Sequence, residues 1–96
     1  MKVNILIVED EVDIREGVSE YLSEVGYNVI SAEDGMQAIE IFNKNKFDLV
    51  ILDIMLPKAN GFIVLNKIRE ESNVPVIMLT AMSDDYTQIM SFDEEA

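Results

Sequence analysis

Four short apolar runs, each followed by a longer amphipathic segment, constrain the fold of this chain more than any other feature. The runs occupy residues 3–8, 27–32, 47–52 and 74–79, and they are rich in Val, Ile and Leu. Short apolar runs of this kind are typical of strands that are covered on both faces of a sheet. The sequence therefore predicts four strands that belong to one parallel sheet.

The segments that follow the runs have the spacing of amphipathic helices, with apolar residues three and four positions apart. The expected inner faces consist of Ile14, Val18, Tyr21, Leu22 and Val25 in the first helix, Ala38, Ile39 and Phe42 in the second, Phe62, Leu65 and Ile68 in the third, and Tyr86, Ile89 and Met90 in the fourth. Gly26 can end the first helix in a left-handed conformation, and Asp34 can cap the second. Ser83 or Asp84 can cap the fourth. Strands that alternate with helices predict an α/β domain with helices on both faces of the sheet.

The length and charge of the chain limit its organisation and its partners. Ninety-six residues, 49% of them hydrophobic, are expected to form a single domain over residues 1–96. The formal net charge is −12, from 19 acidic and 7 basic residues. Such a surface repels phosphate backbones, so we expect no direct contact between this segment and a nucleic acid. The absence of Cys and His excludes disulfides, thiolate or His-ligated zinc sites and a Ser-His-Asp triad.

The first apolar run is the only candidate for a targeting or membrane segment near the start of the chain. It covers residues 3–8, contains Asn4 and ends in acidic residues. A run of this length is too short for the core of a signal peptide or for a membrane span. We therefore expect a cytoplasmic protein without a membrane contact.

Polar residues follow three of the four predicted strands. Glu9 and Asp10 follow the first strand, Asp53 ends the third, and Thr80 ends the fourth. Ligands in such folds bind outside the carboxyl ends of the strands, so these side chains should share one site. At a separation of about 5 Å and an effective dielectric constant of about 20, each pair of carboxylates would repel by roughly 3 kcal/mol. A divalent cation would offset this repulsion, and an all-oxygen site favours Mg²⁺, or alternatively Mn²⁺, over zinc.

The same site has the chemistry of a phosphoryl acceptor. A carboxylate beside a bound cation, such as Asp53, can act as a nucleophile toward a phosphoryl group and form an aspartyl phosphate. The hydroxyl of Thr80 can then donate a hydrogen bond to a phosphoryl oxygen, and the small Ala81 leaves space for the incoming group.

Each of these motifs also has a purely structural interpretation. The acidic residues 9–11 could only favour the dipole of the first helix, Asp53 could be a turn residue, and Thr80 could be a β-branched strand end. Three independent structural explanations would then have to be true at the same time. A phosphoacceptor site accounts for all three motifs, and for their place at one edge of the sheet, with a single explanation.

The ordered set of motifs resembles the receiver domains of two-component response regulators. The residues that carry the resemblance are Val8-Glu9-Asp10-Glu11, the loop Asp53-Ile54-Met55-Leu56-Pro57-Lys58-Ala59-Asn60-Gly61, and Leu79-Thr80-Ala81. The resemblance implies that Asp53 is the phosphoacceptor, that Glu9, Asp10, Asp53 and the Met55 carbonyl bind Mg²⁺, that Thr80 is the switch hydroxyl and that Ala81 lies beside the phosphoryl site. A flavodoxin-like, doubly wound sheet of order 2-1-3-4 is also implied. Four of the family's five βα units are present, and the fifth strand, with its phosphate-binding lysine, is missing.

The function implied by the resemblance is that of a switch rather than an enzyme. A sensor histidine kinase would donate a phosphoryl group to Asp53, and the face of the fourth helix would change to control an output such as transcription. An alternative is a receiver-like interaction module that is not phosphorylated. A metal-dependent phosphatase with an aspartyl nucleophile is a further alternative, but its two aspartates one residue apart on the first strand are absent here, since Glu9 and Asp10 are adjacent.

The missing fifth strand leads to an expectation about association. Without it, the strand over residues 74–79 would be an apolar edge whose unpaired backbone invites pairing with another chain. The first helix would also lack a neighbour and expose part of Ile14, Val18 and Tyr21. We therefore expect the chain to form a homodimer or to self-associate, to swap segments or to be marginally folded, and to take up phosphate poorly.

Overall fold

One five-stranded sheet organises the chain. The structure is a computed structural model that describes residues 3–53, 61–83 and 86–92. Its elements are β1 (Asn4–Val8), α1 (Val12–Val25), β2 (Asn28–Ala32), α2 (Gly35–Lys44), β3 (Leu49–Asp53), α3 (Gly61–Glu71), β4 (Val76–Ser83) and β5 (Tyr86–Phe92). The strand order is β2-β1-β3-β4-β5, and the first four strands are parallel. The predicted α/β class and the parallel order 2-1-3-4 are confirmed.

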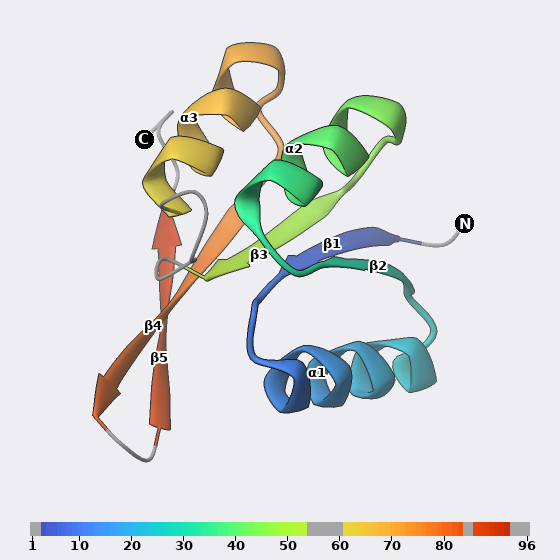
Figure 1. Cartoon of the computed structure of the whole chain (residues 1–96). Helices are drawn as coiled ribbons and strands as arrows, with labels where there is room; N and C mark the ends of the chain where they lie inside the picture. Colours follow the sequence, from blue (N-terminus) through green and yellow to red (C-terminus); the bar gives the residue numbers. More distant parts are fainter. Residues whose placement is uncertain (1–2, 54–60, 84–85, 93–96) are drawn as a thin grey trace.

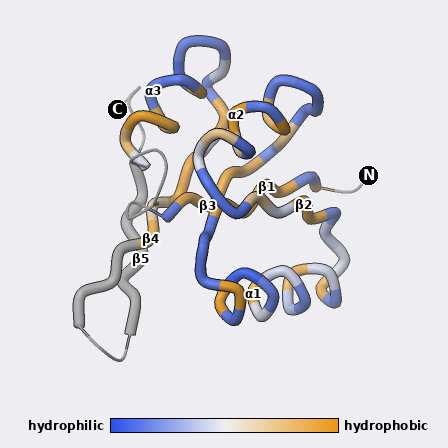
Figure 2. Tube along the Cα trace, viewed as in Figure 1, coloured by the Kyte–Doolittle hydropathy of each residue, from blue (hydrophilic) through white to orange (hydrophobic). Residues whose placement is uncertain are grey.

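The helices form a layer on each side of the sheet, α1 on one side and α2 with α3 on the other (Figure 1). The main core lies between the sheet and the α2–α3 layer. Its fully buried members include Leu6, Val8, Val50, Leu52 and Met78, which alternate along three adjacent strands. Figure 2 shows the same concentration of hydrophobic residues along β1 and β3. None of the helices in the described ranges is long and apolar enough to cross a membrane.

Two predicted helix boundaries are confirmed by their backbone geometry. Gly26 follows α1 with a φ of 120°, and its N–H donates to the carbonyls of Leu22 and Ser23. Asp34 precedes α2, and its side chain accepts a hydrogen bond of 2.9 Å from the N–H of Gln37. A left-handed glycine and an Asp cap satisfy backbone groups that a helix end leaves unpaired, so these local signals fix where the two helices stop and start.

The predicted inner face of α1 is only partly covered. Val18 and Leu22 are half-buried. In contrast, Ile14, Tyr21 and Val25 are 39%, 67% and 54% exposed. This agrees with the expectation that α1 exposes apolar surface, because the contacts of α1 within the described part of the chain are mainly with β1 and β2.

The inner face of α3 differs at one position from the prediction. Leu65 and Ile68 are buried as expected, but Phe62 is 43% exposed. Val64 is fully buried in the core instead. The helical spacing that selected Phe62 also fits Val64, which lies on the same side as Leu65 and Ile68.

The predicted fourth helix is wrong, because residues 86–92 form the strand β5. This strand pairs antiparallel with β4, with Thr80 opposite Gln88 and Val76 opposite Phe92. The helix prediction rested on three apolar residues, and so short a pattern does not separate helix from strand. The segment has β-branched and aromatic residues, and no glycine or basic last turn to end a helix. Pairing with β4 also provides backbone partners along an edge that a helix would have left open.

Candidate functional site

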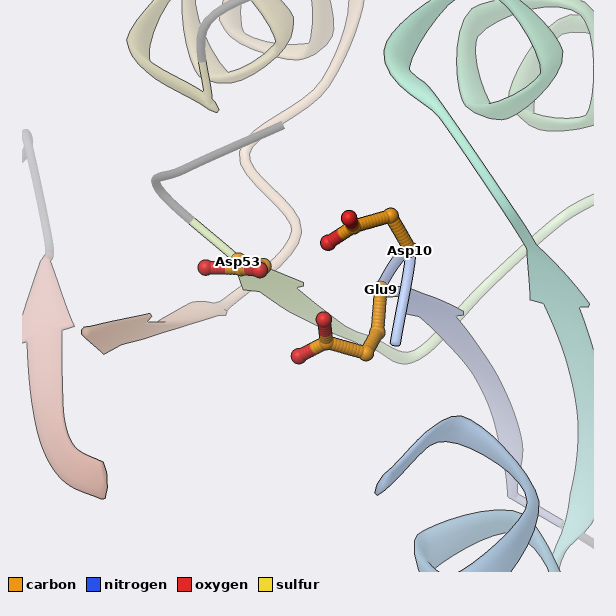
Figure 3. A group of neighbouring side chains, drawn as sticks. All are labelled: Glu9, Asp10 and Asp53. Atoms are coloured by element: carbon orange, nitrogen blue, oxygen red, sulfur yellow. The ribbon is translucent and has the colours of Figure 1, made fainter. Parts of the chain in front are cut away.

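The carboxyl ends of β1 and β3 bring the predicted acidic residues together (Figure 3). Val8 pairs with Leu52 in the parallel register, so the next residues along the two strands, Glu9 and Asp53, are neighbours. Asp10 follows in the turn toward α1. One carboxylate oxygen from each of these three acidic residues lies within 4.8 Å of the other two. The predicted convergence of Glu9, Asp10 and Asp53 is therefore present in the structure.

The turn between β1 and α1 is held by hydrogen bonds that fix the position of Glu9. Its N–H donates to the carbonyl of Ala32 at 3.1 Å, which ties the end of β1 to the end of β2. Its carboxylate accepts the N–H of Glu11, the residue that precedes α1, at 3.0 Å. A buried carboxylate that accepts a backbone N–H has little freedom to turn away from the cluster.

Arg15 is a positioning residue that the sequence analysis did not identify. From the first turn of α1, its guanidinium donates to the carbonyl of Glu9 at 3.0 Å and to that of Asp10 at 3.4 Å. Arg15 is the only basic residue in α1, and it stands six positions after Glu9. A single basic residue so close to the acidic residues 9–11 is the sequence signal that could have identified Arg15. Its hydrogen bonds set the backbone from which two of the three carboxylates project.

Burial distinguishes the three carboxylates. Glu9 is 4% and Asp53 is 9% exposed, whereas Asp10 is exposed. Burial, followed by hydrogen bonding to Asp53 and the charge of Asp53, raises the pKa of Glu9 to about 8, against the opposing effect of the Glu11 N–H. Glu9 therefore carries a proton around neutral pH unless a positive charge enters the cluster.

The cluster fits a hard divalent cation. Its donors are three carboxylates from β1, the following turn and β3, and the chain contains no Cys or His that would favour a softer metal. The raised pKa of Glu9 shows that the site penalises a further negative charge. A cation would remove that penalty by replacing the proton.

Thr80 and Ala81 lie on the strand next to Asp53. Asp53 pairs with Leu79, so the backbone of Thr80 lies one residue further along the neighbouring strand than Asp53. Thr80 is inside β4 rather than at its end, since the strand continues to Ser83 along β5. Met55, the predicted backbone ligand, lies outside the described residues.

A separate hollow lies at the opposite end of the sheet and does not include the acidic residues. Its volume is about 210 Å³, and its lining comprises Asn4, Asn28, Ile30, Asn45, Lys46 and Phe47. The hollow flanks the first residues of β1 and β2. The candidate site is therefore the group of carboxylates at the carboxyl ends of the strands, and it is separate from this hollow.

Comparison with known proteins identifies relatives of this chain. The family model described as "Response regulator receiver domain" matches residues 5–96. Regulatory protein VanRB of Enterococcus faecalis is 45% identical over 96 residues, which is 100% of this chain and 44% of that protein. Response regulator RR06 of Streptococcus pneumoniae is 44% identical over 91 residues, which is 95% of this chain and 42% of that protein. The chain thus spans less than half the length of these curated relatives.

Solved structures show the same similarity in shape. Chemotaxis protein CheY4 of Vibrio cholerae matches with a TM-score of 0.83 and 33% identity, over 88% of this chain and 73% of that one. Response regulator protein TrrA of Thermotoga maritima, solved in complex with Mg²⁺-BeF, matches with a TM-score of 0.79 and 44% identity. That match covers 86% of this chain and 72% of the TrrA chain.

Proposed function

This chain belongs to the family of response regulator receiver domains, and from that premise we propose that it is a phosphorylation-dependent switch whose phosphoacceptor is Asp53. The observation that carries the proposal is the convergence of three carboxylates within 4.8 Å at the ends of β1 and β3. The burial of Glu9 and Asp53 in that cluster supports it, because two buried acidic residues without a cation destabilise a fold.

The proposed reaction transfers a phosphoryl group from a sensor histidine kinase. A carboxylate oxygen of Asp53 attacks the phosphorus of a phosphohistidine in line with the P–N bond. The new O–P bond forms as the P–N bond breaks, and the imidazole leaves with the electron pair and takes up a proton. The product adds about −1.5 to −2 charges at the end of β3. Each donation modifies one domain once, so the chain acts as a switch rather than as an enzyme that turns over a substrate.

The remaining site residues prepare Asp53 for this reaction. Glu9 and Asp10 would hold Mg²⁺ together with Asp53 and the backbone carbonyl of Met55, and Mn²⁺ fits the same donors. When bound, the cation neutralises negative charge that develops on the phosphoryl oxygens. Arg15 keeps the Glu9–Asp10 backbone in place through its carbonyls. The relative TrrA, solved with Mg²⁺-BeF, supports Mg²⁺ as the ion.

We further propose that β4 transmits the change. The hydroxyl of Thr80 would donate a hydrogen bond to a phosphoryl oxygen, and the small Ala81 would leave room for that group. Both residues pair with β5, at Gln88 and Thr87. Because residues 86–92 form a strand, the surface that responds is the β4–β5 hairpin and not the helix face expected from the sequence. The phosphoryl group then stabilises one of two pre-existing arrangements.

The partners follow from the same proposal. In the cytoplasm, a sensor histidine kinase supplies the phosphoryl group to this chain, and a second copy of the chain is the expected binding partner. Relatives of this chain are named transcriptional regulators, which supports transcription as the controlled output. The DNA contact would come from another part of such a protein, since this segment is strongly acidic.

Intact-mass spectrometry after incubation with acetyl phosphate and Mg²⁺ tests the proposal. In line with the poor uptake expected from the sequence, we expect a single phosphoryl adduct on a minor fraction of the chains, lost in Asp53→Asn and lost when the cation is chelated. Asp48→Asn is the matched control, because Asp48 precedes β3 at the opposite end and accepts the N–H of Asn4 at 2.8 Å. An adduct that persists in Asp53→Asn would exclude this acceptor. No adduct in the unmodified chain would favour the interaction module that is not phosphorylated.

A further inference from the structure

We propose that the hollow at the amino end of the sheet is a second ligand site, which binds a single-ring aromatic carboxylate that also carries a hydroxyl group. Two parts of the chain form this hollow, the first residues of β1 and β2 and the loop from α2 to β3. In Figure 1 that loop lies at the end of the sheet where β1 begins. The acidic cluster lies at the other end of the same strands, so the proposal does not depend on phosphoryl transfer.

Strand register sets the floor of the hollow. Asn4 and Asn28 are partners across the parallel β1–β2 pair, and Ile30 stands two residues further along β2. Side chains two positions apart point to the same face of a sheet, so all three share one face. It is the face of the main core, because Ile30 pairs with the core residue Leu6. Ile30 is nevertheless 40% exposed, so α2, which ends at Lys44, leaves this part of the face uncovered.

Two asparagine amides provide hydrogen-bonding groups on that floor. Nδ2 of Asn28 donates to Oδ1 of Asn4 at 3.1 Å, and the backbone N–H of Asn4 donates to Asp48 at 2.8 Å. Among the described residues, the side-chain NH2 of Asn4 and the side-chain oxygen of Asn28 have no hydrogen-bond partner. The pair therefore offers one donor and one acceptor to a ligand. A hydroxyl group, which both donates and accepts, can satisfy the two together.

The wall of the hollow combines an aromatic ring with a positive charge. Phe47 is half-buried, and its ring stacks on that of Phe42 with the centroids 6.0 Å apart. Lys46 precedes it and lines the same hollow. Residues 41–47 contain two lysines and no acidic residue, in a chain with 19 acidic and 7 basic residues. Because most of the surface repels anions, this loop is a favourable place for a carboxylate.

The volume of the hollow limits the ligand to one ring. The hollow holds about 210 Å³. Sites for drug-sized ligands hold about 300–1,000 Å³, whereas a cavity of about 150 Å³ admits benzene. A benzene ring with two small substituents therefore fits. The ring would contact Ile30 and Phe47, the carboxylate would pair with Lys46, and the hydroxyl would bind the two asparagine amides.

Titration of the unmodified chain with para-hydroxybenzoate, followed by backbone amide NMR, tests the site. We expect saturable shift changes in the millimolar range that are largest in the residues lining the hollow, and not in Glu9, Asp10 or Asp53. Benzoate lacks the hydroxyl group and para-hydroxybenzamide lacks the charge, so each should bind at least about threefold more weakly. The proposal is overturned by no saturable change, by the largest changes at the acidic cluster, or by equal binding of the three compounds.

A pair of charge variants identifies the cation. Lys46→Gln should weaken the binding of para-hydroxybenzoate by at least about threefold and remove its advantage over para-hydroxybenzamide. Lys67→Gln makes the same change of charge on α3, outside this hollow, and should bind like the unmodified chain. Both lysines are exposed, so neither substitution should disturb the fold. Unchanged binding in Lys46→Gln, or equal weakening in both variants, would contradict the proposal.

Discussion

The two faces of the sheet are covered to very different extents. On the face that packs against α2 and α3, Leu52 and its neighbours are fully buried. On the opposite face, α1 contacts β1 and β2, and Ile7 on β1 is buried, whereas Ile51 on β3 is only half-buried among the described residues. One face therefore supplies most of the packing that holds the strands in register. Because that register brings Glu9 beside Asp53, the site depends on the well-packed face.

The largest expected effect comes from deleting side chains on the two faces at neighbouring positions. Leu52→Ala should lower the free energy of unfolding by about 2–5 kcal/mol, because it leaves a cavity in a fully buried site. Ile51→Ala removes a similar volume from a half-buried site, and we expect about 1–2 kcal/mol. Urea unfolding of both variants measures the difference. Equal losses would mean that the two faces are packed equally well.

A second prediction concerns the pH dependence that the buried Glu9 imposes. Its pKa is raised to about 8 by burial and by Asp53, so the folded state binds a proton that the unfolded state releases near its ordinary pKa of 4.5. Stability should therefore fall as the pH rises from about 5 through 8, by at most a few kcal/mol. Glu9→Gln should remove this dependence. Mg²⁺ should oppose it at pH 8, since the cation stabilises the ionised carboxylate.

Urea unfolding at several pH values, with and without Mg²⁺, checks this prediction. The informative quantity is the difference between the unmodified chain and Glu9→Gln, because other carboxylates contribute equally to both. Parallel pH profiles for the two proteins would show that Glu9 is not held in its protonated form.

The smallest expected effect on stability tests the exposure of apolar residues on α1. Tyr21 on α1 is 67% exposed, so Tyr21→Ser should change the free energy of unfolding by no more than about 0.5 kcal/mol. The same substitution should reduce the binding of a fluorescent apolar dye to the folded chain. A loss of stability comparable to that of Leu52→Ala would place Tyr21 in a packed contact.

Several features of the fold were predictable because independent local signals agreed. Continuous apolar runs, the left-handed Gly26 and the Asp34 cap pointed to the same strand and helix boundaries, and the parallel order then placed Glu9, Asp10 and Asp53 at one edge. The topology of the sheet determines which residues meet at its carboxyl edge, and the alternation of strands and helices in the sequence predicts that topology.

The features that were not predicted depend on tertiary contacts. The three apolar residues on which the helix prediction rested, Tyr86, Ile89 and Met90, suit either a helix or a strand, and residues 86–92 pair with β4 as a strand. The exposure of Phe62 and the burial of Val64 depend on how α3 packs on the sheet, which helical spacing alone does not fix. Arg15 donates hydrogen bonds to two backbone carbonyls, and a sequence pattern does not predict where those carbonyls lie in space.

The most direct test of the central claim is to locate the phosphoryl group chemically. Treating the chain with acetyl phosphate and Mg²⁺ and then with borohydride reduces an aspartyl phosphate to homoserine, which peptide mass spectrometry assigns to one position. The buried acidic cluster at the ends of β1 and β3 predicts homoserine at position 53 alone, and only when the divalent cation is present. Homoserine at position 10 or 48, or none at any position, would contradict the assignment of Asp53 as the acceptor.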